Sequence, residues 1–194
     1  MINIDIETKC FNMNNRLVSI AFVDQRSIGI ENSVFLETQI NIYGDSKSLY
    51  ILGALFNLIQ KEKSIIVYLQ RSSNKASDIV LFHGTSNPIT YSDCVNLRKK
   101  AYKVKTNKKY SLEINEETKA DKLYESWKFK DLYSIRSNGQ LILMSCNLLG
   151  LRLAELICKS LIDTNDGHTH FDDMSTKESL ELIIRNKDTD MIFQ

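Results

Sequence analysis

Two carboxylates lie two residues apart near the start of the chain, in the segment "NIDIETKC" at positions 3 to 10. In a β-strand successive side chains point to opposite faces, so Asp5 and Glu7 share one face and the neighbouring isoleucines share the other. Two like charges side by side repel each other unless water or a cation separates them. The spacing therefore fits either an exposed strand face or part of a metal site.

Three further residues could complete a metal site. The segment "GHTHFDDM" at 167–174 offers His168 and, five residues later, Asp173, and the middle of the chain offers Asp78. In a two-metal nuclease, oxygen ligands hold Mg²⁺ or Mn²⁺ and a histidine can deprotonate the attacking water. Four carboxylates and one imidazole supply these groups.

These polar residues also have simpler interpretations. His168 could be an ordinary exposed loop histidine. Asp172 lies beside the expected ligand and could bind metal in its place. Asp45 and Asp93 compete with Asp78 for the role of a mid-chain ligand, although Asp45 is better suited to cap a helix.

The apolar pattern predicts the elements that must position these residues. We expect strands at 2–7, 17–23, 33–40 and 64–69, and another after the turn at Asn138-Gly139. We expect helices from Asp45 or Ser46, over a short segment that carries Asp78, over "YSDCVNLRKKAYK", at 147–162 and at 172–186. Strand, helix and strand in succession are typical of an α/β fold, and we find no internal repeat.

The composition is typical of one globular domain of 194 residues, with 43% hydrophobic and 25% charged residues. No apolar run approaches the roughly 20 residues that cross a bilayer, and the N-terminus lacks a secretory signal pattern. We therefore expect no membrane partner and an intracellular, cytoplasmic location. The four cysteines are scattered without a CxxC pair, which favours reduced thiols over disulfides or a zinc knuckle.

A basic stretch without an acidic residue follows the middle of the chain, with Tyr102 and Tyr110 interleaved. Its members are Arg98, Lys99, Lys100, Lys103, Lys105, Lys108 and Lys109. Such a run forms either a solvated face or a surface that attracts a phosphate backbone.

These features resemble the motifs of the DEDDh, or DnaQ-like, 3′-to-5′ exonucleases. The first motif of that family is Asp-x-Glu in an opening strand, and "IDIET" at 4–8 is similar to it. The third motif is a His followed five residues later by an Asp, as in "HTHFDD" at 168–173. Asp78 stands at the place of the second motif, although the His-Asn pair that usually precedes this Asp is missing.

The resemblance implies a single exonuclease domain over 1–194 with an α/β, RNase H-like fold, in which helices flank a mixed central sheet built from an antiparallel meander plus parallel strands. It implies that two Mg²⁺ or Mn²⁺ ions are held by Asp5, Glu7, Asp78 and Asp173, with His168 as the general base. Nucleic acid, RNA in preference to DNA, would lie along Arg98, Lys99, Lys100, Lys103 and Lys105. The alternatives are a DNA proofreading or repair subunit and a catalytically silent nucleic-acid-binding module of the same fold.

Two short segments are similar to the C-terminal exonuclease domain of arenavirus nucleoproteins: "SWKFKDL" at 126–132 and "DMIFQ" at 190–194. This similarity implies a larger parent nucleoprotein or ribonucleoprotein, a double-stranded RNA substrate, and a role in evading immune sensing in the host cytoplasm. Where those domains have zinc-binding Cys and His residues, this chain has "YSIRSNG" and Thr169. We therefore expect no structural zinc.

Overall fold

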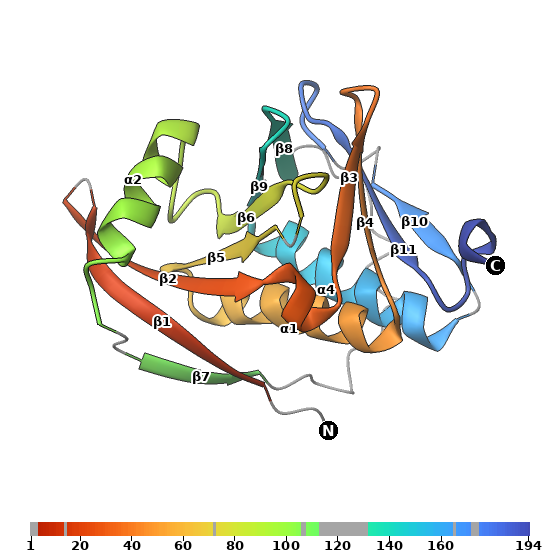
Figure 1. Ribbon diagram of the computed structural model, residues 1–194, viewed down its shortest axis with the longest axis horizontal. Coiled ribbons are helices and arrows are strands. Elements are labelled where there is room, and N and C mark those ends of the chain that lie inside the picture. The colour runs from red at the N-terminus through yellow and green to blue at the C-terminus, as the bar shows by residue number, and fades with distance from the viewer. Residues whose placement is uncertain are drawn as a thin grey trace.

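The computed structural model describes residues 4–13, 15–71, 73–105, 108–112, 132–164, 166–171 and 175–194 (Figure 1). Within these residues the strands form two mixed sheets. The first contains, in spatial order, β7 (Lys108–Leu112), β1 (Ile4–Met13), β2 (Arg16–Asp24), β5 (Ile65–Gln70), β6 (Asp78–His83), β9 (Leu141–Cys146) and β8 (Tyr133–Ser137). The second contains β10 (His168–His170), β11 (Glu181–Asn186), β4 (Gln39–Gly44) and β3 (Glu31–Phe35). The helices are α1 (Ser46–Lys61), α2 (Tyr91–Ala101) and α4 (Leu148–Asp163), with short 3-10 turns η1 (Gln25–Ile28) and η3 (Met191–Phe193).

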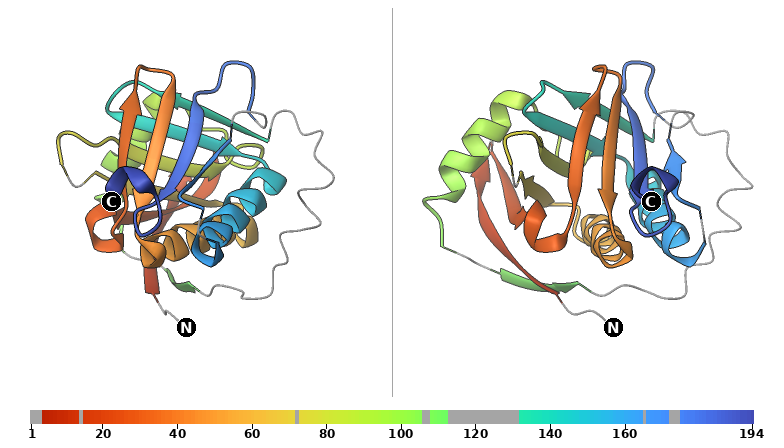
Figure 2. Two further views of the ribbon diagram at one scale, coloured as in Figure 1. Left: turned by 90° about the vertical axis from the view of Figure 1, so that its right-hand side faces the viewer. Right: turned by 45° about the vertical axis from the view of Figure 1, so that its right-hand side comes forward.

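The first sheet confirms the expected fold class. Strands β1 and β2 are antiparallel, whereas β2 pairs in parallel with β5 and β6 pairs in parallel with β9. Helices α1 and α4 lie side by side against one face (Figure 2). On the opposite face, α2 packs its buried Leu97 against Ile20 and Tyr68. A mixed sheet flanked by helices is consistent with an RNase H-like α/β fold.

The structure also contains an internal repeat that we did not find in the sequence. The hairpin β3–β4 and helix α1 recur 102 residues later as the hairpin β8–β9 and helix α4, without insertion or deletion. The two helices begin at Ser46 and Leu148, and each has 16 residues. Of the ten buried residues of α1, nine have a buried counterpart at the same position of α4. The side chains differ, as with Phe56 and Cys158, so the repeat is one of burial rather than of residue identity.

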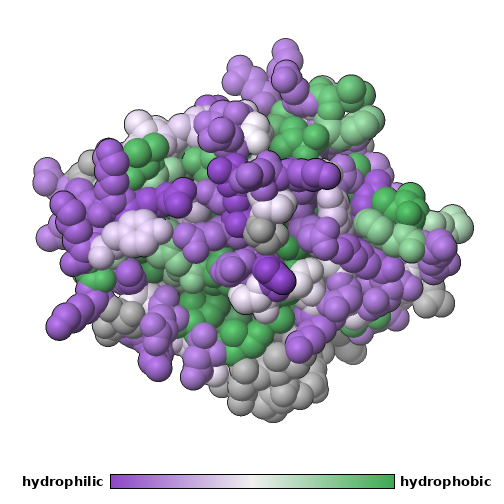
Figure 3. All heavy atoms as spheres, in the orientation of Figure 1, coloured by the Kyte–Doolittle hydropathy of each residue, from purple (hydrophilic) through white to green (hydrophobic). Residues whose placement is uncertain are grey.

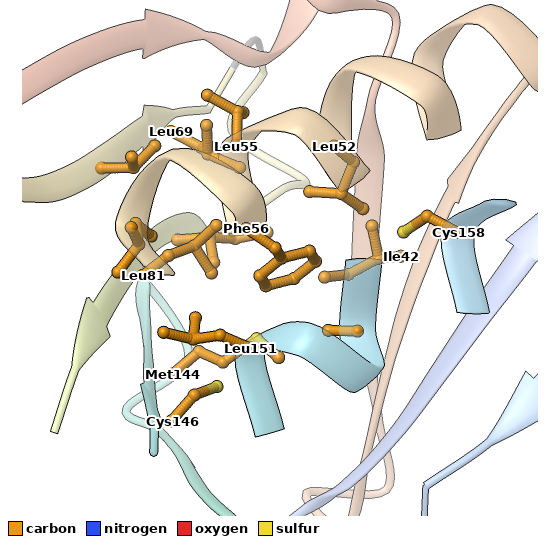
Figure 4. Packing of buried hydrophobic residues seen from close by; sticks show 14 of the residues in the cluster. Ile42, Leu52, Leu55, Phe56, Leu69, Leu81, Met144, Cys146, Leu151 and Cys158 are labelled. Carbon is orange, nitrogen blue, oxygen red and sulfur yellow. The ribbon is translucent and has the colours of Figure 1, made fainter. Parts of the chain in front are cut away.

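In each repeat the helix is followed by a strand pair, β5–β6 in the first repeat and β10–β11 in the second. The last strand of each pair lies in a sheet beside a strand of the other repeat. Strand β11 of the second repeat pairs in parallel with β4 of the first, and β6 of the first pairs in parallel with β9 of the second. Helices α1 and α4 pack against each other beneath this exchange. Figure 4 shows Phe56 of α1 among Ile42, Leu151 and Met144, which come from both repeats. One apolar core therefore joins the two halves of the chain.

Three expected elements differ from the structure. The expected strand at 33–40 is the hairpin β3–β4, and β3 and β4 belong to the second sheet. The segment that carries Asp78 is strand β6 and not a short helix. The described part of the expected helix at 172–186 contains strand β11. β6 is almost continuously apolar, and β11 carries Leu182, Ile183 and Ile184 in succession, buried on both faces. Both strands therefore lack the alternation that identifies a strand with one wet face.

The three longest helices agree with the expectations from periodicity. Asp45 caps α1 by accepting a hydrogen bond from the Ser48 backbone N–H at 2.7 Å. Asp93 completes a capping box with Thr90 at the start of α2. Both carboxylates that competed with Asp78 for a ligand role therefore stabilise helix N-termini, Asp45 as the N-cap of α1 and Asp93 as the capping-box partner of Thr90. The four cysteines are reduced, as expected, and Cys94, Cys146 and Cys158 are buried.

Candidate functional site

Asp5 and Glu7 lie on the exposed face of β1, as the alternation predicts, while Ile6 and Thr8 are buried. Glu7 Oε1 lies 3.4 Å from the Lys109 ammonium on the neighbouring strand β7. Both partners of this ion pair are more than half exposed, so its contribution to stability is small.

Asp78 is buried at the first position of β6, and both of its carboxylate oxygens are engaged. The Tyr68 hydroxyl donates to Oδ2 and the Arg71 backbone N–H donates to Oδ1, each at 2.8 Å. The Arg98 guanidinium lies 3.5 Å from Oδ2 and 5.7 Å from the centre of the Tyr68 ring. Burial and the hydrogen bond to Asp78 raise the pKa of Tyr68 well above its usual range, so the hydroxyl keeps its proton.

The sheet order separates Asp78 from the carboxylates of β1. Strands β2 and β5 lie between β1 and β6. Three strand spacings amount to roughly 14 Å, whereas ligands of one metal pair must lie within a few ångström of the same ions. Over the described ranges, no group of three His, Cys, Asp or Glu side chains is placed to hold a metal ion.

His168 lies in the second sheet, on β10. Its Nδ1 is 3.2 Å from Asp190 Oδ2, and Arg185 Nη1 donates to the same oxygen at 2.7 Å. Although burial acts in the opposite direction, hydrogen bonds from Arg185 and from the Ile192 backbone N–H lower the pKa of Asp190. Asp173 lies outside the described residues. The structure therefore brings Asp5 and Glu7 together but places Asp78 and His168 elsewhere.

The internal repeat gives Asp78 a structural explanation. Asp78 begins β6 and accepts a hydrogen bond from Tyr68 of the preceding strand β5. At the matching place in the second repeat, Glu181 begins β11, and its Oε1 lies 2.5 Å from Nδ1 of His170 on β10. In each repeat a carboxylate at the first residue of the last strand anchors a side chain of the strand before it.

A pocket of about 350 Å³ opens beside Asp78, between α2 and the start of β9. Arg71 and Arg98 border it together with the amides of Asn138 and Gln140, and the buried hydroxyl of Tyr91 has no hydrogen-bond partner among the described residues. Two guanidinium groups and two amides suit a polar or anionic ligand. The sequence offered no signal for this pocket, because its residues come from four separate segments.

A second polar feature is the α2 basic surface, which joins the end of α2 to β1 and β7. We define it as Lys9, Lys99, Lys100, Tyr102, Lys103, Lys105 and Lys109. Lys108 is not included, because it lies on the opposite face of β7, with its ammonium 3.8 Å from Glu62 Oε1. Lys100 donates to the Asn12 carbonyl at 3.3 Å, and Lys9 donates to the Ala101 carbonyl at 3.1 Å. The Tyr102 ring is 71% exposed, and the Lys9 ammonium lies 6.0 Å from its centre. Hydrophilic residues prevail on the side of the molecule where α2 lies (Figure 3).

His170 has no role in the sequence motifs, although the structure places its Nδ1 2.5 Å from Glu181 Oε1. The signal that could have identified it is the His-x-His spacing, because residues two apart on a strand share a face. The segment "SWKFKDL", on which the similarity to arenavirus domains depends in part, lies outside the described residues except for Leu132.

Comparisons of the chain with protein-family models, with curated proteins and with solved structures find no match. A function must therefore be inferred from the geometry of the molecule itself. Across the described portion of the chain, no helix combines the length and apolar character that crossing a membrane requires.

Proposed function

We propose that the protein binds single-stranded nucleic acid through the α2 basic surface, with RNA as the favoured ligand. The observation that carries this proposal is the exposed ring of Tyr102, which has the Lys9 ammonium of β1 6.0 Å from its centre and Lys99 and Lys103 close by in the chain. An aromatic ring in this setting can stack on a base while the ammonium groups neutralise the flanking phosphates. The geometry supports binding better than hydrolysis, because the expected metal ligands that are described do not form one cluster.

The binding can be tested by fluorescence anisotropy with labelled single-stranded RNA, single-stranded DNA and double-stranded RNA of matched sequence. We expect Lys99→Gln with Lys103→Gln to weaken binding at least about 10-fold in low salt and to flatten its salt dependence, since two phosphate contacts are lost. Tyr102→Ala should weaken binding by about 5-fold or more for single strands, because a stacking contact is removed.

A matched control removes the same charge elsewhere. Lys47 and Lys177 are exposed and lie outside the α2 basic surface. The variant Lys47→Gln with Lys177→Gln should bind as the original chain does. Equal losses in the two double variants would show that net charge, and not this surface, governs binding, and would contradict the proposal.

A second candidate function is that of a metal-dependent 3′-to-5′ exonuclease, and one observation supports it. Asp5 and Glu7 share an exposed strand face next to Lys109 of the α2 basic surface. Mg²⁺ is commonly bound by one or two carboxylates together with substrate phosphates. If the protein is such an exonuclease, we also expect it to be part of a larger nucleoprotein, to act in immune evasion and to be located in the cytoplasm.

The exonuclease candidate is tested with 3′-labelled RNA and DNA in Mg²⁺ or Mn²⁺. Shortening from the 3′ end that is lost in Asp5→Asn and in EDTA would support it. The absence of cleavage on every substrate, with binding retained, leaves the binding module as the function.

A further inference from the structure

Two histidines stand side by side on β10, away from the α2 basic surface. His168 and His170 are two residues apart on one strand, and their side chains are 40% and 44% exposed. Their ring centres are 5.2 Å apart, and the ring planes are inclined by 62°. The two imidazoles therefore form an accessible pair and not a buried structural contact.

A carboxylate fixes each imidazole at the same nitrogen. His168 Nδ1 lies 3.2 Å from Asp190 Oδ2, and His170 Nδ1 lies 2.5 Å from Glu181 Oε1. Since a carboxylate accepts, the proton of each neutral imidazole resides on Nδ1, and Nε2 keeps its lone pair. Histidine ligands of metal ions are commonly held by this carboxylate–imidazole arrangement, which orients the ring and makes Nε2 more basic.

The two carboxylates are themselves held in place. Arg185 donates to Asp190 Oδ2 at 2.7 Å, and Gln39 donates through its amide to Glu181 Oε2. Asp190 and Glu181 together carry two negative charges against the single positive charge of Arg185. The surroundings of the histidine pair therefore favour an added cation.

The spacing of the rings fits one shared metal ion. A Zn–N bond is about 2.0–2.1 Å long, so the centre of a ligating imidazole lies about 3.2 Å from the metal. Two such rings at a tetrahedral angle have their centres about 5.2 Å apart, which is the separation between His168 and His170. Imidazole nitrogen suits Zn²⁺ and its transition-metal neighbours, whereas Mg²⁺ prefers oxygen.

We propose that His168 and His170 bind one transition-metal ion of the Zn²⁺ type through their Nε2 atoms, with water or an exchangeable ligand at the remaining positions. Two protein ligands leave the ion open, so the site is an exchangeable surface site and not a closed structural one. The proposal does not depend on nucleic-acid binding. It is incompatible with His168 as a general base, because a coordinated Nε2 cannot accept a proton.

Calorimetric titration of Zn²⁺ alone into the full chain tests the proposal, in a Cys10→Ser background because the other three cysteines are buried. We expect one ion per chain. His168→Gln and His170→Gln should each weaken binding at least 10-fold, and Glu181→Gln should weaken it about 10-fold by releasing the His170 ring. Thr169→Val is the matched control on the same strand, and it should bind as the background protein does.

Proton NMR of the unsubstituted chain provides a readout that does not depend on any variant. The chain has three histidines, and His83 is buried, so its ring signals serve as an internal reference. Zn²⁺ should shift the ring signals of His168 and His170 together and leave those of His83 unchanged. Retained affinity in both histidine variants, or unshifted signals of His168 and His170 at saturating Zn²⁺, would overturn the proposal.

Discussion

At the scale of single residues, Asp78 shows how a carboxylate that matches a motif by type can be held by contacts that the sequence does not reveal. Its carboxylate has the right chemistry for a metal ligand, but a tyrosine, a backbone amide and an arginine already occupy it. Local spacing predicted the exposed pair on β1 and the Asp45 cap of α1, because those depend on neighbouring residues. It could not predict that Tyr68 and Arg98 would reach Asp78 from two other elements.

Replacing Asp78 should therefore change stability more than a surface carboxylate would. Asp78→Ala leaves the buried Tyr68 hydroxyl and the Arg71 N–H without their acceptor, and we expect a loss of about 1–3 kcal/mol in the free energy of unfolding. Asp5→Ala, on the exposed face of β1, should stay within about 0.5 kcal/mol of the original chain. Urea denaturation at neutral pH measures both, and equal stabilities would contradict the structural role of Asp78.

At the scale of elements, the two repeats begin their helices in the same way with different chemistry. Asp45 caps α1 and accepts from the Ser48 N–H at 2.7 Å, whereas Asn147 caps α4 and accepts from the Gly150 N–H at 2.8 Å. One cap is ionisable and the other is not. Side-chain and backbone hydrogen bonds from Ser48 lower the pKa of Asp45 below its ordinary value of 3.8.

The two caps should consequently differ in their dependence on pH. Each alanine variant, Asp45→Ala and Asn147→Ala, should lower the free energy of unfolding by about 1 kcal/mol at pH 7. Because the folded pKa of Asp45 is depressed, its contribution is complete above pH 3.8 and is lost as the pH falls through the folded value.

Thermal denaturation between pH 2 and 7 measures how much each alanine variant lowers the free energy of unfolding. The cost of Asp45→Ala should shrink toward the acid end, while the cost of Asn147→Ala should remain constant. A parallel decline in both would assign the effect to general acid destabilisation and not to the Asp45 cap.

Periodicity predicted α1, α2 and α4 because a helix buries one stripe of its own residues. It failed for β6 and β11, since a strand buried on both faces has no alternation to recognise. The register of β4 with β11, which joins residues such as Gln39 and Glu181, has no local signature at all. The spacing of His168 and His170 is enough to predict that they share one strand face. It is not enough to predict the carboxylates that orient the two rings.

At the scale of the whole molecule, the exchange of strands makes each half of the chain complete the sheet of the other. Phe56 is fully buried where the two repeats meet (Figure 4). Local opening of one repeat would expose the core of both. We therefore expect β4 of the second sheet and β9 of the first to open in one cooperative event.

Phe56→Ala should destabilise both sheets together, by about 3–5 kcal/mol in the free energy of opening. Phe35→Ala is the matched control, because that ring on β3 is 55% exposed. Native-state hydrogen exchange reports each strand separately. Loss of protection confined to one sheet would show that the two halves open independently.

The exchanged strands also constrain the order in which the two sheets can form while the chain is being synthesised on the ribosome. β6 and its partner β9 begin 63 residues apart, at Asp78 and Leu141, so the first sheet can pair while synthesis continues. Gln39 of β4 must instead wait for Glu181, 142 residues later. Until then the hairpin β3–β4 offers an open edge that bears Ile40 and Ile42, and nascent chains pass through a long interval in which that edge can pair wrongly.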